Sequence, residues 1–120
     1  MIVGVGMDII DIERITRAYE KNNQFVKRIL TGVELDMFEQ LENRRQMEFL
    51  AGRFAAKEAY SKAVGTGIGK LRFTDMEVGK GERGEPVWQQ PIPPQCRVHL
   101  SITHTKSVAA AQVIIEERQP

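Results

Sequence analysis

The amino-acid sequence predicts an α+β fold, a single compact domain in which one long helix packs on an antiparallel sheet. Good helix formers dominate residues 11–64, whereas short apolar or alternating segments bounded by Gly and Pro dominate residues 73–115. No internal repeat or long linker divides the 120 residues, so residues 1–120 are expected to form one domain with a modest core.

The first half is predicted to be a strand followed by helices. Residues 2–9 are apolar and form the strand, in which Gly4 and Gly6 permit the close approach of another backbone or of a ligand. Asp11 can cap the first helix, and Gly65 ends the last one. The expected helices cover residues 11–22, 23–30, 33–41 and 44–64.

The second half is predicted to contribute most of the sheet. Residues 97–103 alternate between apolar and polar side chains, which is the period of a half-buried strand, and residues 104–107 turn the chain back onto the last strand. The expected strands cover residues 73–78, 86–89, 97–103 and 108–115.

Charge and cysteine content narrow the functional classes. A net charge of +1 provides no overall field that would favour nucleic acid. The single Cys96 cannot form an internal disulfide, which indicates a reducing compartment. Residues 1–10 are apolar but too short to span a membrane, and they lack a basic leader. We therefore expect a soluble, cytoplasmic protein with neither nucleic acid nor a membrane as its partner.

Common catalytic fingerprints do not fit. The glycine-containing run 65–70 follows a helix and lacks both the Walker and the dinucleotide spacing. Ser101 and His104 lie close together without a nucleophile elbow, so they do not form a catalytic triad. Two histidines, His99 and His104, are too few for a zinc site without cysteine partners.

Two acids stand out because they occupy apolar patterns. Asp8 ends an apolar strand, and Glu58 falls on the same helical stripe as Leu50 and Phe54, the side expected to face the core. Two carboxylates brought together repel each other unless a cation lies between them. A small set of oxygen ligands favours Mg²⁺, which completes its shell with water and substrate phosphates. The alternative is that each acid pairs separately with Arg or Lys.

Basic residues near the same helix suggest that an anionic ligand binds there. Several cations lie within or upstream of the turn that carries Glu58, more than two carboxylates need, and a phosphorylated ligand would supply the missing negative charge. A solvated helix face is the alternative, although the spacing of these cations gives few complementary pairs. The cations are Arg44, Arg45, Arg53, Lys57 and Lys62.

Five short motifs together carry a resemblance to a known family. They are GMDI at residues 6–9, RFAAKEA with SKA at residues 53–63, GTGI at 65–68, GEP at 84–86 and SITHT at 101–105. In this order, and over essentially the whole chain, the sequence resembles the holo-[acyl-carrier-protein] synthases, the small 4′-phosphopantetheinyl transferases of fatty-acid biosynthesis.

The resemblance implies an enzyme that transfers 4′-phosphopantetheine from coenzyme A to a serine of apo-acyl-carrier protein and releases adenosine 3′,5′-bisphosphate. It implies that Asp8 and Glu58 hold Mg²⁺ against the pyrophosphate of coenzyme A, and that Lys62 meets a pyrophosphate oxygen. Glu58 is then the candidate base for the serine proton. By the same resemblance, the residues of the nucleotide end are Arg45, Arg53 and His104 at the phosphates and Gly65, Thr66, Ile68 and Pro86 along its groove.

Acyl-carrier proteins are acidic, so a docking surface should be basic. Arg14, Arg17 and Lys21 recur on one face of the first helix, and Arg28 is a weaker addition to this docking stripe. In isolation such a stripe is more often a solvated face. The family resemblance further implies a homotrimer with coenzyme A bound between subunits.

Two other functions remain open at this point. A noncatalytic module that binds acyl-carrier protein would keep its function without Asp8 and Glu58. A Mg²⁺-dependent phosphohydrolase acting on coenzyme A or a nucleotide would use water and need no protein acceptor.

Overall fold

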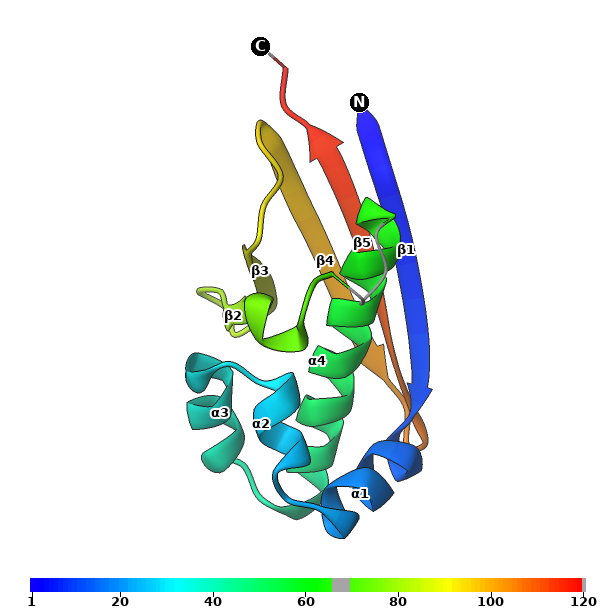
Figure 1. The fold of residues 1–120 in the computed structure, drawn as a ribbon, viewed down its shortest axis with the longest axis vertical. Coiled ribbons are helices and arrows are strands. Elements are labelled where there is room, and N and C mark those ends of the chain that lie inside the picture. The colour runs from blue at the N-terminus through cyan, green and yellow to red at the C-terminus, as the bar shows by residue number, and fades with distance from the viewer. Residues whose placement is uncertain (66–69, 120) are drawn as a thin grey trace.

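One long helix, α4 (Asn43–Val64), lies along one face of a three-stranded antiparallel sheet in the computed structural model, which describes residues 1–65 and 70–119 (Figure 1). The sheet has the order β1-β5-β4, and a separate two-stranded sheet pairs β2 with β3. The predicted α+β fold is thereby confirmed. The other elements are β1 (Ile2–Asp11), α1 (Ile12–Lys21), α2 (Phe25–Ile29), α3 (Gly32–Glu39), η1 (Phe73–Asp75), β2 (Glu77–Lys80), β3 (Pro86–Gln90), β4 (Cys96–His104) and β5 (Val108–Glu117).

The short helices gather at one end of the molecule. Figure 1 shows α1, α2 and α3 around the first turns of α4, whereas the two chain termini lie at the opposite end. None of the described helices is long and apolar enough to cross a bilayer.

Two glycines bring β1 and α4 into close contact. A Cβ at Gly6 would lie 1.9 Å from the carbonyl oxygen of Ala59, and a Cβ at Gly4 would lie 2.3 Å from that of Ala63. Any larger residue would push the helix away from the strand. Of the two uses predicted for these glycines, the structure shows backbone approach, and this contact sets the distance between the functional residues of β1 and those of α4.

The sheet is covered on one face only among the described residues. Ala109, Ala111, Val113 and Ile115 of β5 alternate into the core beneath α4. Side chains of β1 on the other face are apolar and at least half exposed. They are Val3 at 50%, Val5 at 56%, Met7 at 59% and Ile9 at 66%.

Local signals explain the start of α3 and the end of α4. Thr31 and Glu34 form a capping box at the start of α3, and Gly65 ends α4 in a left-handed conformation with φ of 79°. Asp11 stands at the N-cap position of α1 but makes no side-chain capping bond.

The predicted strand over residues 73–78 is wrong in its first half. Residues 73–75 form a 3₁₀ turn, because the Asp75 carboxylate accepts a hydrogen bond from the Arg72 backbone N–H at 3.0 Å and contacts the Arg72 guanidinium. Such local side-chain bonds compete with strand pairing.

Candidate active site

The two predicted acids lie at the junction of β1 and α4. Asp8 on β1 accepts a hydrogen bond from Lys62 Nζ at 3.1 Å, and the same Nζ donates to the Met7 carbonyl oxygen at 2.9 Å. The Asp8 side chain is 15% exposed, whereas that of Lys62 is 55% exposed. Glu58 stands one helical turn before Lys62 on α4 and is partly exposed. The structure thus brings Asp8, Glu58 and Lys62 together in one open cluster.

Glu58 is under electrostatic strain in this cluster. Burial and the nearby negative charge of Asp8 raise the pKa of Glu58, while Lys62 and Arg14 oppose that rise. Among the described residues, no hydrogen bond involves the Glu58 side chain. Lys62 bonds Asp8 and Arg14 acts only through its charge, so the Glu58 carboxylate has no direct cationic partner among the described residues.

The chemistry of these donors fits a hard divalent cation. Asp8 and Glu58 supply oxygen ligands, and a cation between them would relieve the repulsion that raises the pKa of Glu58. The described residues contain no group of three or more His, Cys, Asp or Glu side chains that could hold a metal ion. Two protein carboxylates with water and a phosphorylated ligand are the coordination pattern typical of Mg²⁺.

Lys57 does not belong to this cluster, contrary to the sequence prediction. Lys57 is fully buried on the other side of α4, where its Nζ contacts Glu34 Oε1 at 2.6 Å and donates to the Ile29 carbonyl oxygen at 2.7 Å. Glu34 also accepts hydrogen bonds from the backbone N–H groups of Thr31 and Val78. The deeply buried charges are therefore Lys57 and Glu34, and the expectation that Glu58 faces the core is wrong.

A second candidate region is a groove of about 440 Å³ between α4, the end of β4 and the loop before β3. Arg45, Arg53, Pro86 and His104, four residues predicted for the nucleotide end, all line it. Lys80 and Glu48 line the same groove, and sequence reasoning missed both. The resulting surface is mainly basic and suits a phosphorylated ligand.

Arg53 is the most enclosed cation of this groove. Its guanidinium lies 4.0 Å above the Phe49 ring, and its Nε is buried without a hydrogen-bond partner in the described part of the chain. Burial lowers the pKa of Arg53, and the nearby Glu34 carboxylate opposes this shift. Because Nε has almost no accessible surface, an anion in the groove would meet Arg53 through the other guanidinium nitrogens.

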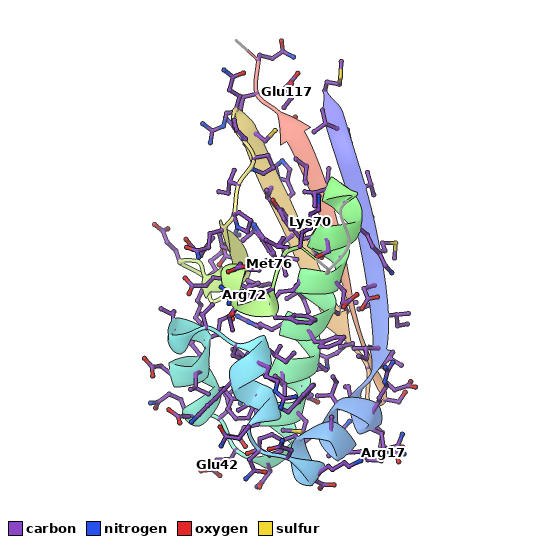
Figure 2. The ribbon with its side chains drawn as sticks, viewed as in Figure 1. Arg17, Glu42, Lys70, Arg72, Met76 and Glu117 are labelled. Carbon is purple, nitrogen blue, oxygen red and sulfur yellow. The ribbon has the colours of Figure 1, made fainter. Side chains whose placement is uncertain are left out.

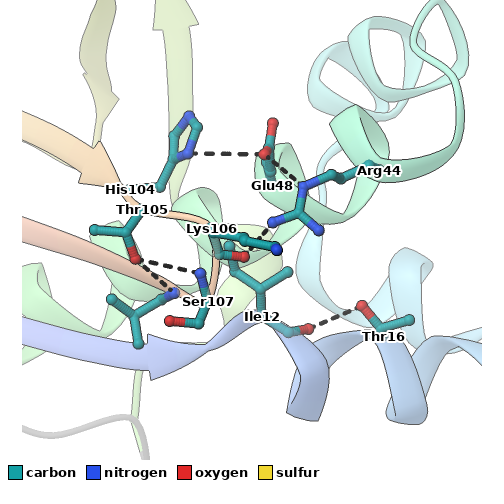
Figure 3. A network of polar contacts seen from close by, with 9 residues as sticks. Ile12, Thr16, Arg44, Glu48, His104, Thr105, Lys106 and Ser107 are labelled. Atoms are coloured by element: carbon teal, nitrogen blue, oxygen red, sulfur yellow. Dashed lines mark hydrogen bonds and ion pairs between the residues drawn. The ribbon is translucent and has the colours of Figure 1, made fainter.

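Glu48 links the groove to the first turn of α4 (Figure 3). Glu48 Oε2 accepts a hydrogen bond from Arg44 Nε at 3.2 Å and lies 3.8 Å from His104 Nδ1. Arg44 also donates to the Lys106 carbonyl oxygen, which ties α4 to the turn between β4 and β5. His104 is thus held beside a carboxylate at the edge of the groove.

The groove and the acid cluster lie at opposite edges of the three-stranded sheet. Asp8 belongs to the edge strand β1 and His104 to the edge strand β4, with β5 between them. Neither Asp8, Glu58 nor Lys62 lines the groove. Gly65 is exposed at the end of α4, and the predicted Thr66 and Ile68 lie outside the described residues.

The docking stripe is exposed on α1. Arg14, Arg17, Lys21 and, on α2, Arg28 all reach solvent, and Arg17 forms an exposed ion pair with Glu13 at 3.1 Å. Figure 2 shows Arg17 on the outer side of α1, at the end of the molecule opposite Glu117. Arg14 acts on the pKa of Glu58, so the stripe begins beside the acid cluster.

The model of the 4′-phosphopantetheinyl transferase superfamily matches residues 4–113 of this sequence. The chain belongs to this family. Holo-[acyl-carrier-protein] synthase from Listeria welshimeri is 56% identical over 117 residues, which cover 97% of this chain and 99% of the relative. The resemblance found in the sequence motifs is therefore confirmed.

Solved structures of phosphopantetheinyl transferases share the fold. The crystal structure of a holo-(acyl-carrier-protein) synthase from Bacillus anthracis in complex with CoA (3′,5′-ADP) is 51% identical, covers 98% of each chain and has a TM-score of 0.90. The synthase from Neisseria meningitidis is 38% identical with a TM-score of 0.86, covering 98% of this chain and all of its own.

Proposed function

We propose that this chain uses Asp8, Glu58 and Lys62 to transfer the 4′-phosphopantetheine group of coenzyme A to a serine of apo-acyl-carrier protein, within fatty-acid biosynthesis in the cytoplasm. The reaction follows from the family and from the synthases that the chain resembles. The observation that supports these residue roles is the cluster itself, in which two carboxylates and one lysine meet where Gly6 lets α4 approach β1.

The transfer is a displacement at phosphorus. The serine oxygen attacks the phosphorus that carries the pantetheine arm, the bond from this phosphorus to the bridging oxygen breaks, and adenosine 3′,5′-bisphosphate leaves. Glu58 is the proposed base that accepts the serine proton. Lys62 donates to a pyrophosphate oxygen, and Asp8 fixes the position of Lys62 through their hydrogen bond.

Asp8 and Glu58 are the proposed ligands of Mg²⁺. When bound, the ion supplies positive charge that offsets the pyrophosphate. Lys62 provides a second, permanent positive charge from the same side.

The groove is the proposed site for the nucleotide end of coenzyme A. Arg45, Arg53 and His104 are the proposed contacts of its phosphate oxygens. Pro86 forms part of the groove wall. Gly65, Thr66 and Ile68 are also proposed to line the binding site of the nucleotide end, as the family resemblance implies.

The separation of the two regions supports a homotrimer. Asp8 and His104 lie at opposite edges of one sheet. A ligand that contacts both the acid cluster and the groove is therefore best bound between the β1 edge of one subunit and the β4 edge of another. The exposed apolar side chains of β1, on the face of the sheet opposite α4, would then be buried against a second copy of the chain. Replacing Met7 with Lys should yield monomers in analytical ultracentrifugation, whereas replacing the equally exposed Val33 of α3 should not.

Intact-mass spectrometry tests the proposed function directly. Apo-acyl-carrier protein is incubated with coenzyme A, Mg²⁺ and the enzyme, and a gain of one phosphopantetheine is expected. EDTA and the Glu58→Gln variant should both abolish the gain. An unmodified carrier beside folded wild-type protein would contradict the transferase function for that acceptor, and release of the bisphosphate without a carrier would indicate a phosphohydrolase instead.

A further inference from the structure

Glu48 is unexpected in a groove proposed to bind phosphate. It is the single carboxylate among the described residues that line the groove, where Arg45, Arg53, Lys80 and His104 supply positive or protonatable groups. A negative charge at this place weakens the binding of any phosphate. Its presence therefore calls for a second role.

The geometry leaves one oxygen of Glu48 available. Oε2 takes both contacts, the hydrogen bond from Arg44 Nε at 3.2 Å and the 3.8 Å approach of His104 Nδ1. Oε1 has no hydrogen bond within the described part of the chain, and Figure 3 shows it pointing away from both partners. The Glu48 side chain is 21% exposed, so a ligand in the groove can reach it.

The first turn of α4 holds this carboxylate in place. Arg44 bonds Glu48 through Nε and the Lys106 carbonyl oxygen through Nη2, so the guanidinium bridges α4 and the turn between β4 and β5. A carboxylate fixed by one oxygen presents the other as a directed acceptor. His104, a proposed phosphate contact, lies beside the same carboxylate.

We propose that Glu48 Oε1 accepts a hydrogen bond from the free ribose hydroxyl next to the phosphate that His104 contacts. This inference rests on the proposed function, because it assumes that the groove takes the 3′-phosphorylated nucleotide end of coenzyme A. A carboxylate that reads a ribose 2′-hydroxyl is an established solution in other nucleotide sites. Glu48 thereby selects a ribose with one phosphate and one free hydroxyl, and Arg44 is its positioning residue.

Calorimetric titration with two nucleotides tests the inference. Adenosine 3′,5′-bisphosphate and its 2′-deoxy analogue differ only in the hydroxyl assigned to Glu48. Wild-type protein should bind the ribose form about tenfold more tightly, the strength of a hydrogen bond to a charged acceptor. The preference should fall to about threefold in Glu48→Gln, which keeps an uncharged acceptor, and to about one in Glu48→Ala.

The ratio of the two affinities separates this role from a structural one. If Glu48 acts only by holding His104, its removal weakens both nucleotides equally and the ratio stays at the wild-type value, which would overturn the inference. Arg44→Met should reduce the ratio, since it releases the carboxylate, whereas Glu117→Gln on β5 is the control and should leave it unchanged. A wild-type protein that binds neither nucleotide would instead contradict the proposed function of the groove.

Discussion

Lys57 and Glu58 are neighbours in the sequence of α4, yet they lie in opposite electrostatic environments. Lys57 is fully buried, and its ammonium group contacts the Glu34 carboxylate and the Ile29 carbonyl oxygen. Glu58 faces an open cluster in which the half-exposed Lys62 bonds Asp8, and the Glu58 carboxylate has no direct cationic partner among the described residues. The charge of Lys57 is matched within the protein, whereas the charge of Glu58 leaves room for a cationic ligand.

The difference separates a structural ion pair from a functional one. The Lys57 and Glu34 contacts join α4 to α2, α3 and β2, so they fix the helix about its axis. A fixed helix in turn directs Glu58 toward Asp8. Mutations on the buried side should therefore reduce stability, and mutations on the open side should reduce activity.

Asp8→Asn should give the largest effect on the open side. Loss of the Asp8 charge removes a proposed metal ligand and the acceptor that orients Lys62, so the transfer rate should fall by about 1,000-fold. The free energy of unfolding should change by less than about 1 kcal/mol, because the Asp8 to Lys62 pair is only partly buried. Initial rates by mass spectrometry and urea denaturation measure the two quantities.

Asp11→Asn, at the exposed end of the same strand, is the matched control and should keep the wild-type rate. A folded Asp8→Asn enzyme with an undiminished rate would remove Asp8 from the catalytic cluster.

Lys57→Met should show the reverse pattern. It leaves Glu34 as a buried charge without its cation, which lowers the free energy of unfolding by about 3–5 kcal/mol. The comparison is Lys62→Met, five residues later on the same helix, which should lower it by less than about 1 kcal/mol because Lys62 is 55% exposed. Urea denaturation provides both values.

A second variant tests whether the loss comes from the unpaired charge. The double variant Lys57→Met with Glu34→Leu removes both charges and should recover part of the stability, although the Thr31 and Val78 backbone N–H groups then lack their acceptor. If Lys57→Met were as stable as wild type, the buried ion pair of Lys57 and Glu34 would not stabilise the fold.

The sequence patterns predicted the open side better than the buried side. Asp8 was singled out because it ends an apolar strand and Glu58 because it falls on the stripe expected to face the core, and the end of α4 was predicted because Gly65 can adopt positive φ. The partner of Lys57 is 23 residues away, and no short-range pattern connects the two. Successive side chains on a helix point about 100° apart. A small error in the assumed direction of the buried stripe is therefore enough to predict Glu58 as the buried residue in place of Lys57.

Other details depend on tertiary contacts that local patterns cannot contain. The 3₁₀ turn at residues 73–75 arises because Asp75 bonds the Arg72 backbone, although the apolar residues of this segment also suit a strand. In the sequence, Glu48 resembles any helical carboxylate four residues after an arginine. It becomes part of a groove only because the fold places His104, at the end of β4, beside it.

The pH dependence of stability should report the raised pKa of Glu58. Because burial and Asp8 raise the pKa of Glu58 above its ordinary value of 4.5, the protonated carboxyl is favoured in the folded protein. This contribution is fully present below about pH 4.5 and is lost as the pH rises through the folded-state pKa. Melting temperatures measured from pH 4 to 8 should therefore fall more steeply in wild type than in Glu58→Gln.

Mg²⁺ should reduce that difference, because a cation bound by Asp8 and Glu58 favours the ionised form. Parallel pH profiles for wild type and Glu58→Gln would contradict the electrostatic strain assigned to Glu58.

The docking stripe should give the smallest effect, and it distinguishes two arginines that look alike in the sequence. The charge of Arg14 lowers the pKa of Glu58, which places Arg14 near the acid cluster, whereas Arg17 is already paired with Glu13. Arg14→Gln should therefore raise the KM for acyl-carrier protein by about fivefold, and Arg17→Gln by about twofold, with both effects shrinking as salt screens the contacts. Steady-state rates at 50 and 300 mM salt, with Arg97→Gln on β4 as a control, measure this order. Equal effects of Arg14 and Arg97 would show that net charge matters and that the stripe on α1 is an ordinary solvated face.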